Sequence, residues 1–175
     1  MNGHILILGG ARSGKSAYAE DVALALGSRP AYLATAEAGD AEMAERIGAH
    51  RARRPPSFTT YEEPLALITA LQEIGVSHDL VLLDCLTLWI SNMMAAEENV
   101  AEAVMALTGW ITHHSTPRLV IVSNEVGLGI VPDNAKARHF RDLAGTAHQR
   151  LAEACDSVVF TVAGLPMALK GTLPL

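Results

Sequence analysis

The stretch Gly9-Gly10-Ala11-Arg12-Ser13-Gly14-Lys15-Ser16 decides the fold class of this chain. Its fixed positions match the pattern G-x-x-x-x-G-K-[ST], in which glycines let backbone N–H groups curl around a phosphate chain. Residues 4–8 before it form an apolar run typical of a buried strand, and residues 17–26 after it have a helical pattern. The sequence therefore predicts a P-loop, with Lys15 on the outer phosphates and the Ser16 hydroxyl on Mg²⁺.

Strand and helix patterns alternate along the rest of the chain. We expect further strands at residues 31–35, 57–61, 79–84, 118–123 and 157–162, and helices at 40–53, 64–74, 87–94, 97–114 and 132–154. Thr87 is expected to cap its helix, and the tail after Gly164 has no readable pattern. Apolar strands separated by helices predict an α/β fold, a mostly parallel sheet with helices on both faces. The length suits one domain over residues 1–175.

Composition argues against several classes of protein. The chain has 13 Lys and Arg against 19 Asp and Glu, a net charge of −6, so we expect no nucleic-acid partner. No apolar run approaches the roughly 20 residues of a membrane span, and we expect no signal peptide. Cys85 and Cys155 lack metal-ligand spacing and are expected to be reduced core residues of a cytoplasmic protein.

Ligands of such sheets lie at the carboxyl ends of the strands, so the residues that follow each strand are the candidates for chemistry. Besides the P-loop, these are Thr35-Ala36-Glu37, Asp84-Cys85 and Asn124-Glu125-Val126-Gly127. Asp84 ends an apolar strand as a Walker B aspartate does, and we expect it to help hold Mg²⁺. The alternative is an aspartate that caps the next helix.

A histidine lies within an arginine cluster in the predicted helix 40–53. His50 shares a helix face with Met43 and Ile47, and Arg46, Arg51, Arg53 and Arg54 surround it in the sequence. Neighbouring positive charge favours a neutral imidazole, which is a competent nucleophile for a phosphorus atom. Spacing alone nevertheless favours the simpler interpretation, a solvated histidine on a basic helix. Glu62 and Glu63 similarly fit a pair of charges at the start of a helix.

Several motifs together resemble one known family. They are the P-loop, Ala34-Thr35-Ala36, Glu42-Met43 with Arg46-Ile47 and His50-Arg51, Asp84-Cys85-Leu86-Thr87, the run from Asn124 to Pro132, and Arg138-His139-Phe140-Arg141-Asp142. In this order they resemble the bifunctional adenosylcobinamide kinase / adenosylcobinamide-phosphate guanylyltransferase family of cobalamin biosynthesis. The resemblance extends from the P-loop to about Leu165.

The resemblance implies two reactions and a set of site residues. ATP or GTP would phosphorylate adenosylcobinamide, and GTP would then transfer GMP to adenosylcobinamide phosphate through a guanylylated histidine, releasing pyrophosphate. His50 matches that histidine, with Lys15 as the second catalytic residue. The implied nucleotide contacts are Gly9, Gly10, Ala11, Arg12, Ser13, Gly14, Lys15, Ser16, Ala34, Thr35, Ala36, Arg51, Ala52, Arg53, Arg54, Glu62 and Asp84. The implied fold is RecA-like, the cofactor is Mg²⁺ on Ser16 and Asp84, and the assembly is a homotrimer.

Rival functions make different demands on the sequence. A P-loop small-molecule kinase without nucleotidyl transfer is the nearest alternative, but it leaves the His50 cluster unused. A GTP-binding switch needs an Asn-Lys-x-Asp motif, which the sequence does not contain. A DNA-dependent ATPase of the RecA type is disfavoured by the acidic charge and the short length.

Overall fold

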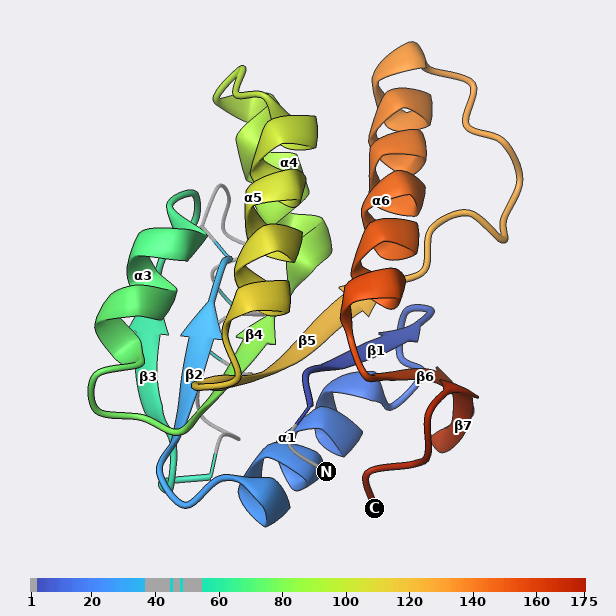
Figure 1. The fold of residues 1–175 in the computed structure, drawn as a ribbon. Helices are drawn as coiled ribbons and strands as arrows, with labels where there is room; N and C mark the ends of the chain where they lie inside the picture. Colours follow the sequence, from blue (N-terminus) through green and yellow to red (C-terminus); the bar gives the residue numbers. More distant parts are fainter. Residues whose placement is uncertain (1–2, 37–44, 46–47, 49–54) are drawn as a thin grey trace.

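The computed structural model describes residues 3–36, 45, 48 and 55–175. They contain a seven-stranded sheet with the order β3-β2-β4-β5-β1-β6-β7 (Figure 1). Neighbouring strands are parallel except for the antiparallel pair β6–β7, which confirms the predicted mostly parallel sheet. The strands are β1 (Ile5–Gly9), β2 (Pro30–Ala34), β3 (Thr59–Glu62), β4 (Leu80–Asp84), β5 (Arg118–Asn124), β6 (Ser157–Val162) and β7 (Leu165–Lys170).

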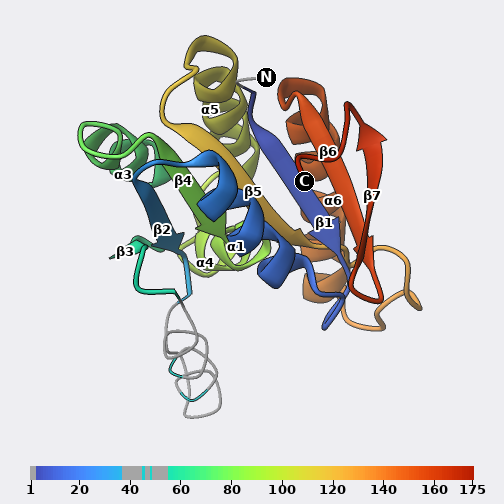
Figure 2. The ribbon, with the colours of Figure 1, turned by 90° about the horizontal axis from the view of Figure 1, so that it is seen from below.

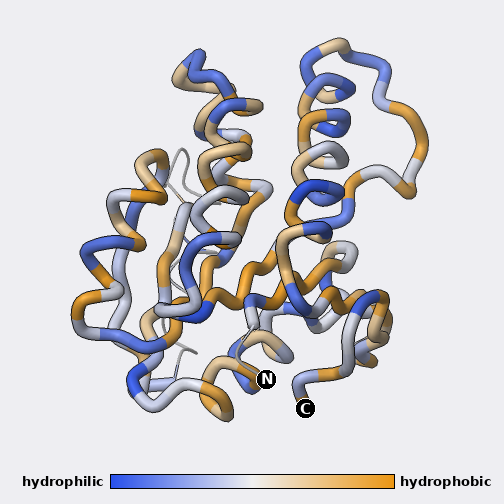
Figure 3. Tube along the Cα trace, in the orientation of Figure 1, coloured by the Kyte–Doolittle hydropathy of each residue, from blue (hydrophilic) through white to orange (hydrophobic). Residues whose placement is uncertain are grey.

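Helices cover both faces of the sheet, as predicted. They are α1 (Lys15–Leu26), α3 (Leu67–Ile74), α4 (Leu86–Ala95), α5 (Val100–His113) and α6 (Ala135–Ala154). Alternate strand residues feed two cores: Ile5 and Ile7 pack toward α1, whereas Leu6 and Leu8 pack with α3 to α6 on the opposite face (Figure 2). Hydrophobic residues accordingly concentrate along the central strands (Figure 3).

Helix starts differ from the predicted ones because of capping. The Asn99 side chain accepts a hydrogen bond from Glu102 N at 3.2 Å, so α5 begins at Val100 rather than at residue 97. Asn134 likewise accepts from Ala137 N at 2.7 Å, so α6 begins at Ala135 rather than at 132. The expectation that Thr87 caps α4 is wrong, because Cys85 occupies the N-cap position.

The predicted strand at residues 157–162 is confirmed as β6, but it is not the last strand, because β7 follows it. Val162 pairs with Leu165 across the two residues Ala163 and Gly164, whose φ angles are 52° and 81°. Positive φ at both central positions is the geometry of a tight hairpin turn, and it returns the chain as β7 along the sheet edge. In the described part of the chain, no helix is both long and apolar enough to cross a membrane.

Candidate nucleotide-binding site

The carboxyl ends of the parallel strands are level with one another. Ala34 at the end of β2 lies opposite Asp84 of β4 and Glu62 of β3. Gly9 at the end of β1 lies opposite Asn124 of β5 and Thr161 of β6. The predicted P-loop, Asp84 and Asn124 therefore lie together at the carboxyl end of the sheet, which is the end where such folds bind ligands.

Glycines shape the loop between β1 and α1. Gly14 precedes α1 with φ 92°, and a Cβ there would lie 2.9 Å from Gly164 Cα. A Cβ on Gly9 would overlap the Ser13 hydroxyl and approach Thr161 O. In the turn between β6 and β7, Gly164 N donates to Ser13 O at 2.8 Å. The P-loop is thus packed against β6 at Gly9 and against the β6–β7 turn at Gly14 too closely for larger residues at these two positions.

Lys15 begins α1 and lies largely buried within the loop. Its Nζ donates to Gly10 O at 3.1 Å. Burial lowers the pKa of the Lys15 ammonium, and the nearby Asp84 carboxylate opposes that shift. A cation held among backbone N–H groups at a helix N-terminus favours a bound anion, as a phosphate-binding role requires.

Asp84 is half-buried at the end of β4, and its Oδ2 accepts a hydrogen bond from the Tyr32 hydroxyl at 2.6 Å. The register explains the contact, because Tyr32 and Ala34 lie on the same face of β2 and Ala34 is level with Asp84. Sequence reasoning missed Tyr32, which reads only as one more residue of an apolar strand. The hydroxyl fixes the orientation of the carboxylate toward the P-loop side of the sheet.

Thr35 is fully buried and has a structural task. Its Oγ1 donates to Cys85 O at 2.8 Å and accepts from Cys85 N at 3.0 Å, which joins the ends of β2 and β4. The Asn92 amide on α4 donates to Thr35 O at 2.8 Å and to Pro64 O at 3.2 Å. Asn92, which no sequence motif marks, therefore ties β2 to the chain that follows β3.

The remaining predicted contacts near β2 and β3 lie at the same carboxyl end of the sheet. Ala34 is buried, Ala36 is half-buried and Glu62 is exposed at the end of β3. Glu63 Oε1 accepts from Leu65 N at 2.8 Å and from Ala66 N at 2.7 Å. Glu63 thus caps the turn before α3, which supports the interpretation of this residue as a charge at the start of a helix.

The predicted nucleophile and the arginine cluster are not among the residues that the structure describes. Glu37, His50, Arg51, Ala52, Arg53 and Arg54 lie outside the described residues. Within the predicted helix 40–53, Glu45 and Gly48 are described, and both are helical. The chain leaves β2 after Ala34 at the carboxyl end of the sheet, where Asp84 lies, and because β2 and β3 are parallel it rejoins the sheet at the amino end of β3. The roles of His50 and residues 51–54 stay predictions.

Cys85 lies beside the site without a reactive thiol. Its Sγ lies 3.3 Å from Thr87 Oγ1, which accepts from Asn124 Nδ2 at 3.1 Å. Burial raises the pKa of the Cys85 thiol to about 11, so it stays protonated at neutral pH. This cluster connects β4, α4 and β5 and explains why the Thr87 hydroxyl is not a helix cap.

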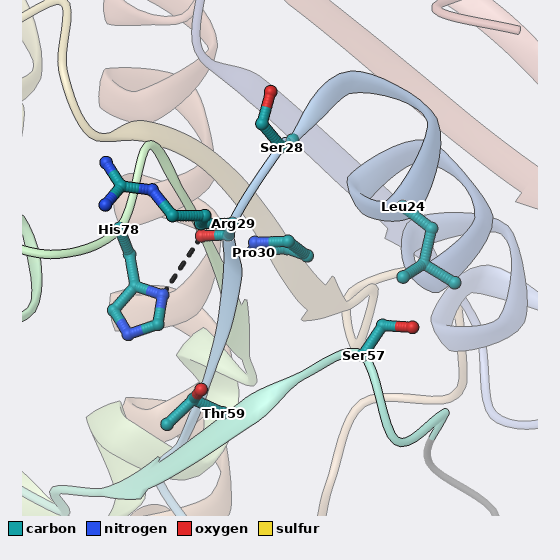
Figure 4. A pocket seen from close by; sticks show the side chains of 8 residues that line it. Leu24, Ser28, Arg29, Pro30, Ser57, Thr59 and His78 are labelled. Carbon is teal, nitrogen blue, oxygen red and sulfur yellow. Dashed lines mark hydrogen bonds between the residues drawn. The ribbon is translucent and has the colours of Figure 1, made fainter.

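A pocket of about 620 Å³ lies at the other end of α1 (Figure 4). Its lining includes Leu24 near the end of α1, Pro30 at the start of β2 and Thr59 at the start of β3. His78 Nδ1 lies 3.0 Å from Arg29 O in its wall. The pocket is at the amino ends of the strands, so it is separate from the P-loop edge.

Solved structures share the fold at low sequence identity. An ATPase from the type III secretion system of pathogenic bacteria matches with a TM-score of 0.57 and 13% identity, covering 91% of this chain and 51% of that chain. The P4 protein from bacteriophage phi6 in complex with ADP matches with a TM-score of 0.50 and 13% identity, covering 94% and 54%. These likenesses confirm the P-loop NTPase fold.

Closer relatives identify the family. A curated relative, the bifunctional adenosylcobalamin biosynthesis protein CobP of Pseudomonas aeruginosa, is 48% identical over 171 residues, 95% of this chain and 96% of the relative. The CobU protein of the same description from Salmonella typhimurium is 37% identical over 182 residues, 95% and 99%. The family described as cobinamide kinase / cobinamide phosphate guanyltransferase matches residues 5–169. This chain therefore belongs to the cobinamide kinase / cobinamide phosphate guanyltransferase family.

Proposed function

We propose that this enzyme phosphorylates adenosylcobinamide with ATP or GTP at the P-loop and then transfers GMP from GTP to the resulting phosphate. The observation that carries the proposal is the P-loop with Lys15 and Asp84 at one sheet edge, in a chain that matches the family over residues 5–169. In the kinase step, the substrate hydroxyl attacks the γ-phosphorus and the nucleoside diphosphate leaves. Lys15 neutralises charge on the outer phosphates during this transfer.

The second reaction divides into two displacements. A neutral His50 nitrogen attacks the α-phosphorus of GTP, the bond to the pyrophosphate oxygen breaks, and a phosphoramidate forms. An oxygen of the cobinamide phosphate then attacks the same phosphorus, and the P–N bond breaks to give adenosylcobinamide-GDP. Because the P-loop serves the γ-phosphate, the segment between Ala36 and Pro55 has to bring His50 to the α-phosphate.

The site residues suit Mg²⁺ bound together with a nucleotide. Among the described residues no cluster of three or more His, Cys, Asp or Glu side chains forms a metal site of its own. Asp84 and the Ser16 hydroxyl would supply two oxygen ligands, and Mg²⁺ commonly combines one or two protein oxygens with phosphate oxygens and water. Bound Mg²⁺ would neutralise charge on the transferring phosphate. Tyr32 orients the Asp84 carboxylate for this role.

The proposed assembly is a homotrimer in the cytoplasm. β7 is an edge strand, and its apolar side chains Leu165, Met167 and Leu169 are all exposed. An exposed apolar stripe on an edge strand favours coverage by another subunit. Both cysteines are buried and unpaired, which suits a reducing compartment. Sedimentation equilibrium tests the assembly, and a monomeric mass would contradict it.

Two radiolabels on GTP test the proposed function. With adenosylcobinamide present, γ-label should pass to the corrinoid, and α-label should appear first on the protein and then on the corrinoid. An α-label that never reaches protein or product, beside normal transfer of the γ-label, would leave a small-molecule kinase as the function.

A further inference from the structure

The loop between β5 and α6 starts against the P-loop. Glu125 N donates to Gly9 O at 2.9 Å, and Asn124 is level with Gly9 in the sheet. The loop, the P-loop and the β6–β7 turn gather at the same end of the sheet (Figure 2). Any molecule that places an oxygen at the P-loop phosphates therefore has this loop as a neighbour.

A buried histidine of α6 holds the base of the loop. His148 Nε2 lies 2.7 Å from Ser123 Oγ, and its Nδ1 lies 3.8 Å from Glu125 Oε2. Glu125 Oε1 accepts from Gly127 N, which fixes the first turn of the loop. The order of carboxylate, imidazole and hydroxyl matches that of a hydrolase triad. Ser123 is fully buried, however, so the cluster positions the loop and does not attack a substrate.

Beyond this anchored turn the loop exposes aliphatic side chains. Leu128 is 82% exposed, Ile130 is 98% exposed and Val131 is 60% exposed. Aliphatic groups this open to water gain free energy when a ligand or partner covers them. The loop therefore has a fixed base and an exposed apolar tip. These are the features of a surface that binds a ligand or a partner beside the P-loop.

We propose that residues 127–131 bind the corrin macrocycle of the acceptor substrate, and that His148 is a positioning residue for this loop. The inference rests on the proposed function, because cobinamide is far larger than the phosphate it receives. With its acceptor oxygen at the P-loop, the macrocycle must extend over neighbouring surface. The loop that contacts Gly9 supplies that surface.

Steady-state kinetics on three variants test the inference. I130S should raise KM for adenosylcobinamide about tenfold, the effect of losing one covered aliphatic side chain. H148Q should raise the same KM, because glutamine can bond Ser123 but cannot also reach Glu125. In both variants kcat and the Kd for GTP should equal the parent values. V76S is the matched control, since Val76 is 86% exposed in the turn between α3 and β4.

Each contrary result has a separate meaning. If the parent phosphorylates adenosylcobinamide and I130S keeps the parent KM, the loop does not bind the corrin and the inference fails alone. A smaller oligomeric mass for I130S in sedimentation would make the loop a subunit contact and also overturn it. If H148Q lowers thermal stability without changing KM, His148 has no positioning role. A parent protein that phosphorylates no corrinoid would instead overturn the proposed function.

Discussion

Replacing Asn92 with alanine removes one side chain that joins the segments that follow β2 and β3. The amide donates to Thr35 O at 2.8 Å and to Pro64 O at 3.2 Å, and both hydrogen bonds disappear in N92A. A net loss of about 1 kcal/mol for each hydrogen bond gives about 2 kcal/mol in the free energy of unfolding. For a chain of this size, that corresponds to a Tm lower by about 4–8 °C.

The same change should affect the two reactions unequally. Thr35 immediately precedes Ala36, where the chain departs toward His50, so a looser anchor should slow nucleotidyl transfer. The P-loop is anchored separately, through Gly9 and Gly164, so corrinoid phosphorylation should change less. Pyrophosphate release and corrinoid phosphorylation, measured on one preparation of N92A, should therefore show a larger decrease in the former.

Urea unfolding and thermal melts provide the stability measurement for N92A. S91A is the matched control, because Ser91 is on the same helix and has an exposed side chain. Ordinary surface substitutions change the free energy of unfolding by up to about 0.5 kcal/mol. If N92A and S91A differ by less than this in the free energy of unfolding, the two hydrogen bonds do not hold the segments after β2 and β3 together.

Three further variants or conditions test other parts of the site. K15A should weaken GTP binding about 100-fold in calorimetry while the protein stays folded, because it removes the cation beside the phosphates; unchanged affinity would refute the P-loop role. D84N should need more Mg²⁺ for half-maximal turnover, and full activity at limiting Mg²⁺ would leave Asp84 without a metal role. Burial lowers the pKa of His4 and of His148 below 6.5, so both favour the neutral form when folded. The free energy of unfolding should therefore fall as pH drops through 6.5 toward the folded-state pKa values, and a urea midpoint that rises on acidification would contradict this.

The parts of the fold that the sequence predicts are those with strong local patterns. The apolar runs at residues 79–84 and 118–123 match β4 and β5 closely, because strands buried on both faces consist almost entirely of apolar residues. β7 escaped prediction because its side chains are mostly exposed and its pattern includes Pro166. The signal that was available is the turn, since Gly164 between two apolar residues favours a tight hairpin.

The site residues also divide into those that local sequence patterns predict and those that they do not. The P-loop and Asp84 follow from motif and strand position, because these fix the backbone around the phosphates. Tyr32, Asn92 and His148 act through partners far away in the sequence, at separations of 52, 57 and 25 residues. Such contacts depend on strand order and helix placement, which local periodicity does not specify.

The central claim, that GMP passes through His50, is tested most directly by H50N. Asparagine keeps hydrogen-bonding capacity but is not a nucleophile, so α-labelled GTP should leave no label on the protein, and pyrophosphate release should fall by several orders of magnitude. Corrinoid phosphorylation should partly survive. H113N is the matched control, because the exposed His113 ring lies at the end of α5, where its Nδ1 is 2.7 Å from Gly109 O of the same helix. Pyrophosphate release by H50N at the parent rate would contradict the account and favour direct attack by the substrate phosphate on GTP.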